Sequence, residues 1–417
     1  MSRPADPPGV PARRASLRLL DAVLRQGLPL ETALENAARG LQGPDRFLPL
    51  AIAGEVLRRL PDLDALIDSA TRQPLAPDAK ARGVLRIALV QAITLGTPPH
   101  AAIATALPLV EGGPRRLVHG VFGTLMRGGA RLPEVPTLPA AVAERWQTAW
   151  GAATVASAAR SIAVPPPLDL SLSGDTPHEL EGTSFAPGHL RLERGHNVAE
   201  LPGFAEGRWW VQDISASLPA RLIGRGPGVA LDLCAAPGGK TMQLAASGWQ
   251  VKALDASKSR LARLRENLAR TGLQAEVTCA DLLRWQPPEP ADAILLDAPC
   301  SATGIFRRHP DVLHRVRPAA IPELAAGQAA MLARAADWLK PGGVLVYAVC
   351  SLEPEEGEAV ARAFLDARSD YRIDPVSDGE VPAEIPRSDE GWLRLLPGLF
   401  ADRGGADSFF IVRFRRN

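Results

Sequence analysis

The stretch LDLCAAPGGKT, residues 231–241, decides the fold of the second half of the chain. An apolar segment, 229–233, leads into two glycines and then into a helix pattern that begins at about Lys240. A strand, a glycine turn and a helix N-terminus suit a polar or anionic ligand, because the first N–H groups of a helix have no partner within it. Glycine also lets a ligand approach the backbone closely. The stretch therefore predicts a ligand-binding loop of the Rossmann type.

Two common nucleotide-binding motifs fail in this loop. The letters GGKT match the end of a phosphate-binding P-loop, but Cys234 stands where that motif needs its first glycine. The dinucleotide fingerprint GxGxxG fails as well. Acidic residues follow the next two predicted strands, Asp255 after 251–254 and Asp281 after 276–279. Carboxylates at such places accept hydrogen bonds from ribose hydroxyls, so the loop and the acids fit S-adenosylmethionine.

Strand and helix patterns alternate from Gly228 to the last residues. Such alternation predicts a doubly wound sheet covered by helices on both faces. We therefore predict a Rossmann-type α/β core with a mixed, mostly parallel sheet over residues 223–417. Further strands are expected at 293–296, 343–349 and 409–414, and further helices from about Ser257 and over 323–339.

The preceding residues divide into three parts. Residues 1–131 show apolar side chains at helical spacing, interrupted by glycine and proline, and predict an all-α domain. We interpret residues 132–164 as a linker followed by one alanine-rich helix over 140–163. Residues 165–222 contain short apolar segments between turn residues and predict a small α/β subdomain. The whole chain is therefore expected to be multidomain.

Composition narrows the class of protein. The chain has 417 residues, of which 46% are hydrophobic and 22% charged, as in globular proteins. We expect a cytoplasmic protein without a membrane partner, because no apolar run reaches about 18 residues and residues 1–10 lack a signal-peptide core. Residues 1–131 carry 17 Lys+Arg against 11 Asp+Glu, which favours contact with phosphates over a merely solvated surface only weakly.

The four cysteines are more consistent with catalysis than with structure. No pair has CxxC spacing, so a metal is not expected, and no export signal suggests disulfides. Cys300 follows strand 293–296 in the run Asp297-Ala298-Pro299-Cys300-Ser301, and Cys350 follows strand 343–349. Ligands bind outside the carboxyl ends of strands in such sheets, so both thiols and Asp297 are expected beside the cofactor. A single cysteine at a strand end most often fills the core, and we interpret Cys279 in that way.

Two thiols and a carboxylate suit methylation of cytosine. Carbon 5 is a poor nucleophile, but a thiolate that adds to carbon 6 makes an enamine, which accepts a methyl group. Asp297, protonated or sharing a proton, could assist at ring nitrogen 3, and a second cysteine could remove the proton from carbon 5 or help to remove it. The base must leave its stack, and a run of four residues after Cys300 offers stacking and phosphate contacts unless it is an ordinary solvated loop: Phe306, Arg307, Arg308 and His309.

These segments resemble the Sun (Fmu) family of bacterial RNA cytosine-5 methyltransferases, whose best-known member modifies 16S ribosomal RNA. Residues 13–127 resemble the NusB-like RNA-binding domain of this branch, through RFLPLAIAGEVLRRLPDLDALI (46–67) and PPHAAIATALPLV (98–110). The segments that match the catalytic part are LDLCAAPGGKT (231–241), LLDAPCSATGIFRRHPD (295–311), LKPGGVLVYAVCS (339–351), DSFFIVRF (407–414) and VQDISA (211–216).

The resemblance assigns roles that sequence order alone leaves open. It implies that Cys350 is the nucleophile and that Cys300 helps to release the product. It implies 16S rRNA as substrate, and we expect a monomer without a metal. The same chemistry on tRNA and a non-catalytic RNA-binding assembly factor are the alternatives. The residues implied to contact S-adenosylmethionine are Cys234, Ala235, Ala236, Pro237, Gly238, Gly239, Lys240, Asp255, Asp281 and Asp297.

The chain departs from the family pattern at four places, and the exact target nucleotide stays open. Val349 precedes Cys350 where threonine is usual, and Gly357 follows Glu356 where asparagine is usual. His119 replaces an asparagine, and Leu168–Leu172 reads LDLSL instead of an Arg-Val-Asn pattern. Because the cysteines, Asp297 and the glycine loop are intact, the chemistry is expected to be retained.

Overall fold

The computed structural model describes residues 7–174 and 179–417, which fold into two compact units. The first unit comprises the described residues up to Val164 together with the segment Phe306–Val316. The second comprises the described residues of Pro165–Ile305 and of Arg317–Asn417. The chain therefore leaves the second unit shortly after Cys300 and returns to it at Arg317, an exchange that no sequence pattern predicted.

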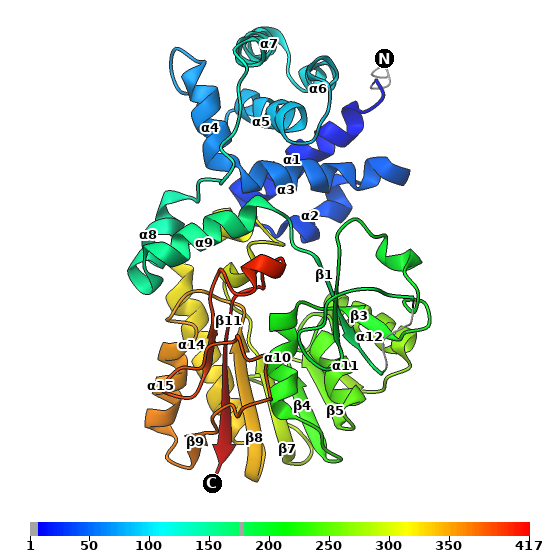
Figure 1. The fold of residues 1–417 in the computed structure, drawn as a ribbon, viewed down its shortest axis with the longest axis vertical. Coiled ribbons are helices and arrows are strands. Elements are labelled where there is room, and N and C mark those ends of the chain that lie inside the picture. The colour runs from blue at the N-terminus through cyan, green and yellow to red at the C-terminus, as the bar shows by residue number, and fades with distance from the viewer. Residues whose placement is uncertain (1–6, 175–178) are drawn as a thin grey trace. The chain divides into compact units, whose positions relative to one another are not determined.

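The described residues up to Arg131 form helices without a strand, as predicted for residues 1–131 (Figure 1). The N-terminal helices are α1 (Val10–Gln26), α2 (Leu30–Ala37), α3 (Leu48–Arg58), α4 (Leu60–Ser69), α5 (Lys80–Ile93), α6 (Pro99–Ala106) and α7 (Gly112–Arg127), with 3-10 helices η1 (Gly43–Arg46) and η2 (Leu107–Leu109). Every residue from Ala81 to Gln91 is buried, because α1, α3, α4, α6 and α7 pack around α5. Within the described residues, no helix is both long and apolar enough to cross a membrane.

The prediction of a single helix over 140–163 is wrong. The structure has two helices there, α8 (Ala140–Trp150) and α9 (Ala152–Ala163). Gly151 separates them with a φ of 81°, a backbone angle that glycine adopts readily and a continuing helix does not. The alanine-rich composition hid this break, because alanine favours helix on both sides of the glycine.

The segment Phe306–Val316 belongs to the core of the first unit. Phe306 is fully buried, and its ring centroid lies 5.4 Å from that of Trp146 in α8. The short helix α13 (Val312–Arg315) follows, and His314 Nε2 lies 2.8 Å from the carbonyl oxygen of Leu57. Buried aromatic pairs stabilise beyond the apolar area that they cover. These contacts therefore anchor the segment among the helices.

The second unit begins with a small antiparallel sheet in the order β2-β1-β3. Its strands are β1 (Leu168–Leu172), β2 (His189–Leu192) and β3 (Trp209–Val211), and the 3-10 helix η3 (Val198–Glu200) lies between β2 and β3. The buried carboxylate of Asp169 in β1 accepts two hydrogen bonds from Arg191, at 2.6 and 2.7 Å. It also accepts the N–H of Ile214, the first residue of α10 (Ile214–Ile223), at 3.0 Å. One carboxylate thus joins the small sheet to the helix that leads into the main sheet.

The main sheet has eight strands, with the order β10-β11-β8-β7-β4-β5-β6 and with β9 paired to β11. Neighbours from β8 to β6 run parallel and β11 runs antiparallel to β8, so the sheet is mixed and mostly parallel, as predicted. The strands are β4 (Val229–Leu233), β5 (Gln250–Asp255), β6 (Glu276–Cys279), β7 (Ala291–Asp297), β8 (Leu339–Val349), β9 (Tyr371–Ile373), β10 (Leu393–Leu395) and β11 (Phe409–Arg416).

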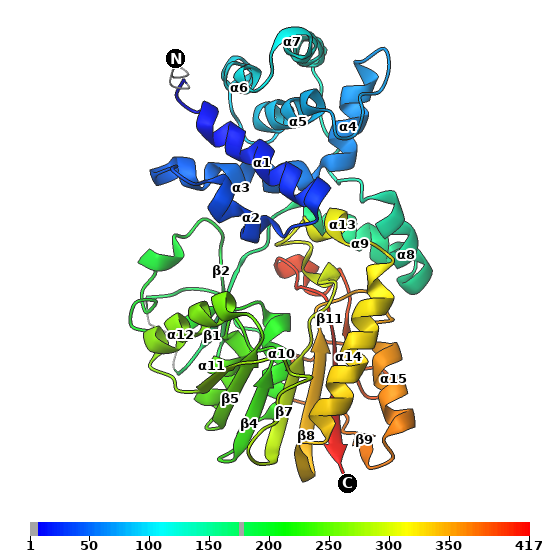
Figure 2. The same cartoon turned by 180° about the vertical axis from the view of Figure 1, so that it is seen from behind.

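Helices cover both faces of this sheet, which confirms the Rossmann-type core (Figures 1 and 2). One face packs against α14 (Ala320–Ala336) and α15 (Glu358–Ala367). The other packs against α10, α11 (Gly239–Ala246) and α12 (Lys258–Thr271). The 3-10 helices η4 (Thr303–Ile305) and η5 (Ala401–Arg403) lie in connections.

The register aligns the carboxyl ends of the parallel strands. Leu233 at the end of β4 pairs with Leu254 of β5 and with Leu296 of β7, and Asp297 of β7 pairs with Ala348 of β8. All four strands therefore end at one edge of the sheet. The loops that follow them are brought together there.

Candidate active site

The glycine loop at this edge is shaped by its backbone. Cys234 has a φ of 65° and Gly238 a φ of 107°, so the chain turns sharply twice before α11 begins at Gly239. A Cβ at Gly238 would lie 3.0 Å from Cγ of Leu264, so this position also has little room for a side chain. The loop thus presents the first N–H groups of α11 at the strand edge.

Cys234, in this loop, lies near carboxylates of the strands β4, β5 and β7. Burial, together with the negative charges of Asp297, Asp255 and Asp232, raises the pKa of Cys234 to about 12. A thiol with that pKa stays protonated at neutral pH and is a weak nucleophile. Cys234 is therefore a poor candidate for the nucleophile.

The two acids after β5 and β6 have different surroundings. Asp255 is buried, and its carboxylate accepts the N–H groups of Ala236 at 3.1 Å and Ser257 at 2.8 Å. It therefore holds the glycine loop in shape. Asp281 is about half exposed and accepts the N–H of Leu283 at 3.0 Å. The interpretation of Cys279 as core is wrong, because β6 is the edge strand of the sheet and leaves that thiol exposed.

Lys240 and Asp297 form an ion pair between the start of α11 and the end of β7. Lys240 Nζ donates to Asp297 Oδ2 at 2.7 Å. Burial opposes the charge of Lys240, but Asp297 and then Cys350 outweigh it and raise the pKa of the ammonium. The raised pKa keeps Lys240 charged at neutral pH. The site has a fixed cation beside the cysteines.

The two cysteines that end adjacent strands lie in contact. Cys300 Sγ and Cys350 Sγ are 3.5 Å apart. The hydrogen bond with Cys350, followed by burial, raises the pKa of Cys300 well above its ordinary value. Cys300 therefore favours its protonated form, and either thiol can be the donor in the contact. A thiol that holds its proton tightly is a weak nucleophile, which disfavours Cys300 as the one that attacks.

Comparison with known proteins matches the helical N-terminal part and the α/β part of the chain to two separate families. Residues 225–415 match the family model described as 16S rRNA methyltransferase RsmB/F, and residues 10–116 match the NusB family. A ribosomal RNA small subunit methyltransferase B from Xylella fastidiosa (strain Temecula1) is 36% identical over 434 residues, which cover 97% of this chain and 98% of that relative. The chain belongs to the RsmB/F family of 16S rRNA methyltransferases.

Solved structures share the fold of this RsmB/F family member. The crystal structure of PH0851 aligns with a TM-score of 0.76 and 22% identity, over 100% of both chains. A methyltransferase homolog protein from Pyrococcus horikoshii aligns with a TM-score of 0.55 and 26% identity, over 71% of this chain and 98% of that one. The fold is thus shared at low sequence identity.

One departure from the RsmB/F family pattern has a structural reason. A Cβ at Gly357 would lie 2.4 Å from Nη2 of Arg394 and 2.8 Å from Cγ of Phe410. An asparagine there would therefore displace Arg394, whose Nη1 donates to the carbonyl of Ser351 at 2.6 Å. The absence of a side chain at Gly357 thus leaves the space that the guanidinium of Arg394 occupies. Val349, the other departure near the site, is fully buried in the apolar layer beneath α14 and α15.

The four residues after Cys300 that were proposed to contact RNA belong to the first unit. Phe306 is fully buried, so the expectation that its ring stacks on a base is wrong for this arrangement. Arg307 is also buried. Arg308 and His309 are partly exposed, and His309 Nδ1 lies 3.8 Å from the carboxylate of Glu31. Only the latter two residues keep accessible surface for a phosphate.

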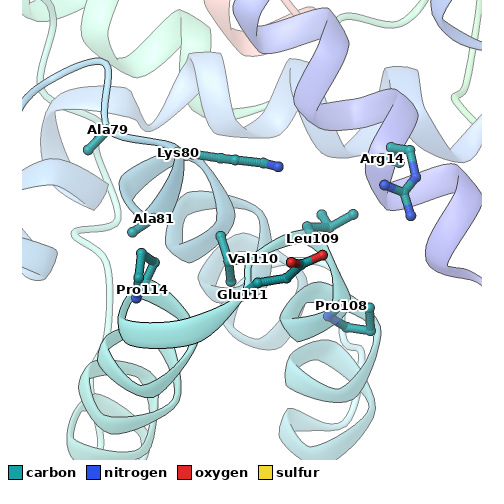
Figure 3. Close-up of a pocket in the computed structure, with 9 residues that line it drawn as sticks. All are labelled: Arg14, Ala79, Lys80, Ala81, Pro108, Leu109, Val110, Glu111 and Pro114. Carbon is teal, nitrogen blue, oxygen red and sulfur yellow. The ribbon is translucent and has the colours of Figure 1, made fainter.

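A pocket of about 450 Å³ lies within the first unit (Figure 3). The side chains of Arg14, Lys80 and Glu111 line it together with apolar residues. Because a carboxylate shares the pocket with the two cations, the pocket does not offer a purely cationic surface to phosphates. It lies outside the unit that contains the cysteines.

Sequence reasoning missed two buried carboxyl groups beside the site. Asp232 in β4 is fully buried and accepts the hydroxyl of Thr241 at 2.5 Å. Glu356 is fully buried between the two cysteine loops. A serine follows each of the two cysteines in the sequence, at Ser301 and Ser351, but that pattern alone does not point to Glu356.

The carboxyl of Asp232 predicts a pH-dependent stability. Burial raises its pKa to about 7, although the Thr241 hydroxyl opposes the rise. The folded state then binds this proton more tightly than the unfolded state. The associated stability is therefore present below the ordinary pKa of 3.8 and is lost as pH rises through about 7. We expect Asp232→Asn to be more stable than the wild type at pH 8, by a few kcal/mol, since a tenfold change in proton affinity corresponds to about 1.4 kcal/mol.

Urea unfolding followed by circular dichroism between pH 5 and 8 measures this difference. The gap between Asp232→Asn and the wild type should shrink as the pH falls toward 5. Asp366→Asn, at an exposed position of α15, is the control and should follow the wild type throughout. A constant gap, or a less stable Asp232→Asn at pH 8, would contradict the assignment.

Proposed function

We propose that this chain transfers a methyl group from S-adenosylmethionine to carbon 5 of a cytosine in 16S rRNA. The observation that carries the proposal is the 3.5 Å contact between the thiols of Cys300 and Cys350, at the ends of two paired parallel strands. Membership of a family of rRNA methyltransferases supports the reaction class and the RNA substrate. Cys350 is the nucleophile in this proposal, and Cys300 serves product release.

The strand edge fits the proposed cofactor. The N–H groups at the start of α11 are donors for its polar end, and the carboxylates of Asp255 and Asp281 are acceptors for hydroxyl and amino groups. The carboxylate of Asp297, held by Lys240, completes the set. The remaining proposed contacts come from the loop residues 234–240. When bound, S-adenosylmethionine supplies an activated methyl group.

In the first step, Cys350 Sγ bonds to carbon 6 of the base, and ring electrons move toward nitrogen 3. The ammonium of Lys240, oriented by Asp297, stabilises that developing charge. The resulting enamine is nucleophilic at carbon 5 and takes the methyl group. The protein residues thus make a reactive carbon from an unreactive one.

Cys300 completes the cycle because its proton affinity depends on Cys350. The hydrogen bond to Cys350 is the largest cause of the raised pKa of Cys300. Once Cys350 Sγ is bonded to carbon 6 it is a neutral thioether and a weaker acceptor, so Cys300 gives up its proton to solvent more readily. Its thiolate then removes the proton from carbon 5, the ring double bond re-forms, and the bond between Cys350 and carbon 6 breaks.

Replacing the proposed nucleophile tests the first step. We expect Cys350→Ala to lower methyl transfer by on the order of 10³-fold or more, because no enamine forms without the thiolate. Transfer of a labelled methyl group to separated 16S rRNA and tRNA measures this, and calorimetry should show that the cofactor still binds. Cys279→Ala, which removes an exposed thiol, is the control and should stay active. Full activity of Cys350→Ala would refute the assignment, and label on tRNA alone would favour the tRNA alternative.

Replacing the second cysteine tests the release step. We expect Cys300→Ala to accumulate a covalent protein–RNA adduct, because Cys350 attacks but the proton on carbon 5 is not removed. A denaturing gel with labelled RNA and cofactor shows this as a slow band. If the band forms with Cys350→Ala and not with Cys300→Ala, the two roles are exchanged. A protein that neither methylates nor forms an adduct would favour the non-catalytic assembly factor.

We also propose that the helical unit binds RNA phosphates. Arg115 and Arg116 are exposed in the first turns of α7, where the helix N-terminus adds partial positive charge. We expect the double charge reversal Arg115→Glu, Arg116→Glu to weaken RNA binding. The slope of log K against log salt should fall by about 0.7 for each RNA phosphate that the variant no longer neutralises. The charge-preserving Arg115→Lys, Arg116→Lys variant should keep the slope, and an unchanged slope after reversal would refute the role of this surface.

A further inference from the structure

Each catalytic cysteine is followed by a serine, and both serines contact one buried carboxylate. Ser301 follows Cys300 after β7, and Ser351 follows Cys350 after β8. Glu356, five residues beyond Ser351, is fully buried between them. The carboxylate therefore joins the loops that carry the two thiols.

Glu356 accepts four hydrogen bonds, two at each oxygen. Oε1 accepts the N–H of Ser301 at 2.9 Å and the side-chain amide of Gln328 at 2.9 Å. Oε2 accepts the hydroxyl of Ser351 at 2.5 Å and the hydroxyl of Ser301. An ionised carboxylate has about four lone-pair sites and no proton to donate, so these donors use it fully. Buried bonds to a charged acceptor are stronger than bonds between neutral groups.

Further hydrogen bonds fix the two loops to the same frame. The Gln328 amide that contacts Glu356 also donates to the carbonyl of Pro299, immediately before Cys300. The N–H of Gly304 donates to the carbonyl of Cys350 at 2.9 Å. The hydroxyl of Tyr347 donates to the backbone carbonyl of Glu356 at 2.5 Å, which holds the residue itself in place. Backbone atoms next to both thiols are thus restrained around one side chain.

We propose that Glu356 is a positioning residue that sets the spacing of the Cys300 and Cys350 sulfurs. The inference rests on the proposed function only for its catalytic consequence, because the 3.5 Å spacing exists without substrate. Glu356 contacts neither sulfur and acts through the serines and the backbone beside them. In Glu356→Gln an NH2 donor replaces one of the two oxygens, so two of the four donors lose their acceptor and the loops are no longer joined through one side chain.

Reaction of the thiols with Ellman's reagent measures the spacing directly. The first thiolate displaces one thionitrobenzoate and forms a mixed disulfide with the reagent. The second thiolate then attacks that mixed disulfide, releases a second thionitrobenzoate and leaves a Cys300–Cys350 disulfide. The second release is intramolecular, so its first-order rate constant reports how closely the sulfurs approach. The full-length chain with Cys279→Ser removes the exposed competing thiol, and Cys300→Ala in that background identifies the second phase by its loss.

We expect Glu356→Gln to slow the second phase by about tenfold, since a displacement of about 1 Å between reacting groups costs up to 10²-fold. Glu355→Gln is the matched control, because it removes the same charge from the exposed neighbouring residue and should leave the phase unchanged. Ser351→Ala and Ser301→Ala are smaller changes that should each slow it less. The double variant Ser351→Ala, Glu356→Gln should slow the second phase by less than the product of the two single fold-changes, because both substitutions remove the same hydrogen bond.

Methyl transfer by the same variants separates this inference from the proposed function. A positioning role predicts that Glu356→Gln lowers kcat and leaves the KM for RNA unchanged. An unchanged second phase in folded Glu356→Gln and in both serine variants overturns the inference, even if methylation falls. If the second phase slows but the wild-type chain methylates neither RNA, the positioning role stands and the proposed function fails.

Discussion

The parallel pairing of β7 with β8 is the constraint on which the site depends. Asp297 and Ala348 are register partners, so the residues that follow them leave the sheet side by side. Cys300 comes three residues after Asp297, and Cys350 two residues after Ala348. The thiols therefore meet because two strands end in register, although fifty residues separate them in the chain. A shift of register by one residue would turn the following side chains to the opposite face and separate the sulfurs.

Negative and positive side chains are unevenly distributed at this edge of the sheet, so the cysteines there have different electrostatic surroundings. Asp232, Asp255 and Asp297 surround the end of β4, and their charges help to raise the pKa of Cys234. Lys240 is the cation that pairs with Asp297, and Cys350 contributes to its raised pKa. A thiolate beside Lys240 is stabilised, whereas a thiolate at Cys234 would face carboxylates. The four cysteines of the chain are thus distinguished by their surroundings and not by their type.

The parts of the fold with a local cause were predictable from the sequence. The glycine loop, the strand ends and the alternation of strands and helices follow from short-range patterns, and those predictions placed Cys300 and Cys350 at the same edge. Glu356 was not predictable, because its role depends on a buried space that forms only when β7, β8 and α14 pack together. Cys279 was misjudged for a similar reason, since a sequence does not say which parallel strand lies at the edge.

The segment after Cys300 shows most clearly where prediction from the sequence fails. The run that begins at Phe306 has the composition of a substrate loop, yet Phe306 packs against Trp146, 160 residues earlier in the chain. Residues 301–305, which precede Phe306, pack instead against backbone of the second unit. A Cβ at Gly304 would lie 2.1 Å from the carbonyl oxygen of Ser408, so only glycine allows the backbone to pass against the loop before β11. The change from one unit to the other therefore occurs between Ile305 and Phe306, and Cys300 is separated from it by five residues, 301–305, that are themselves bonded to the Cys350 loop.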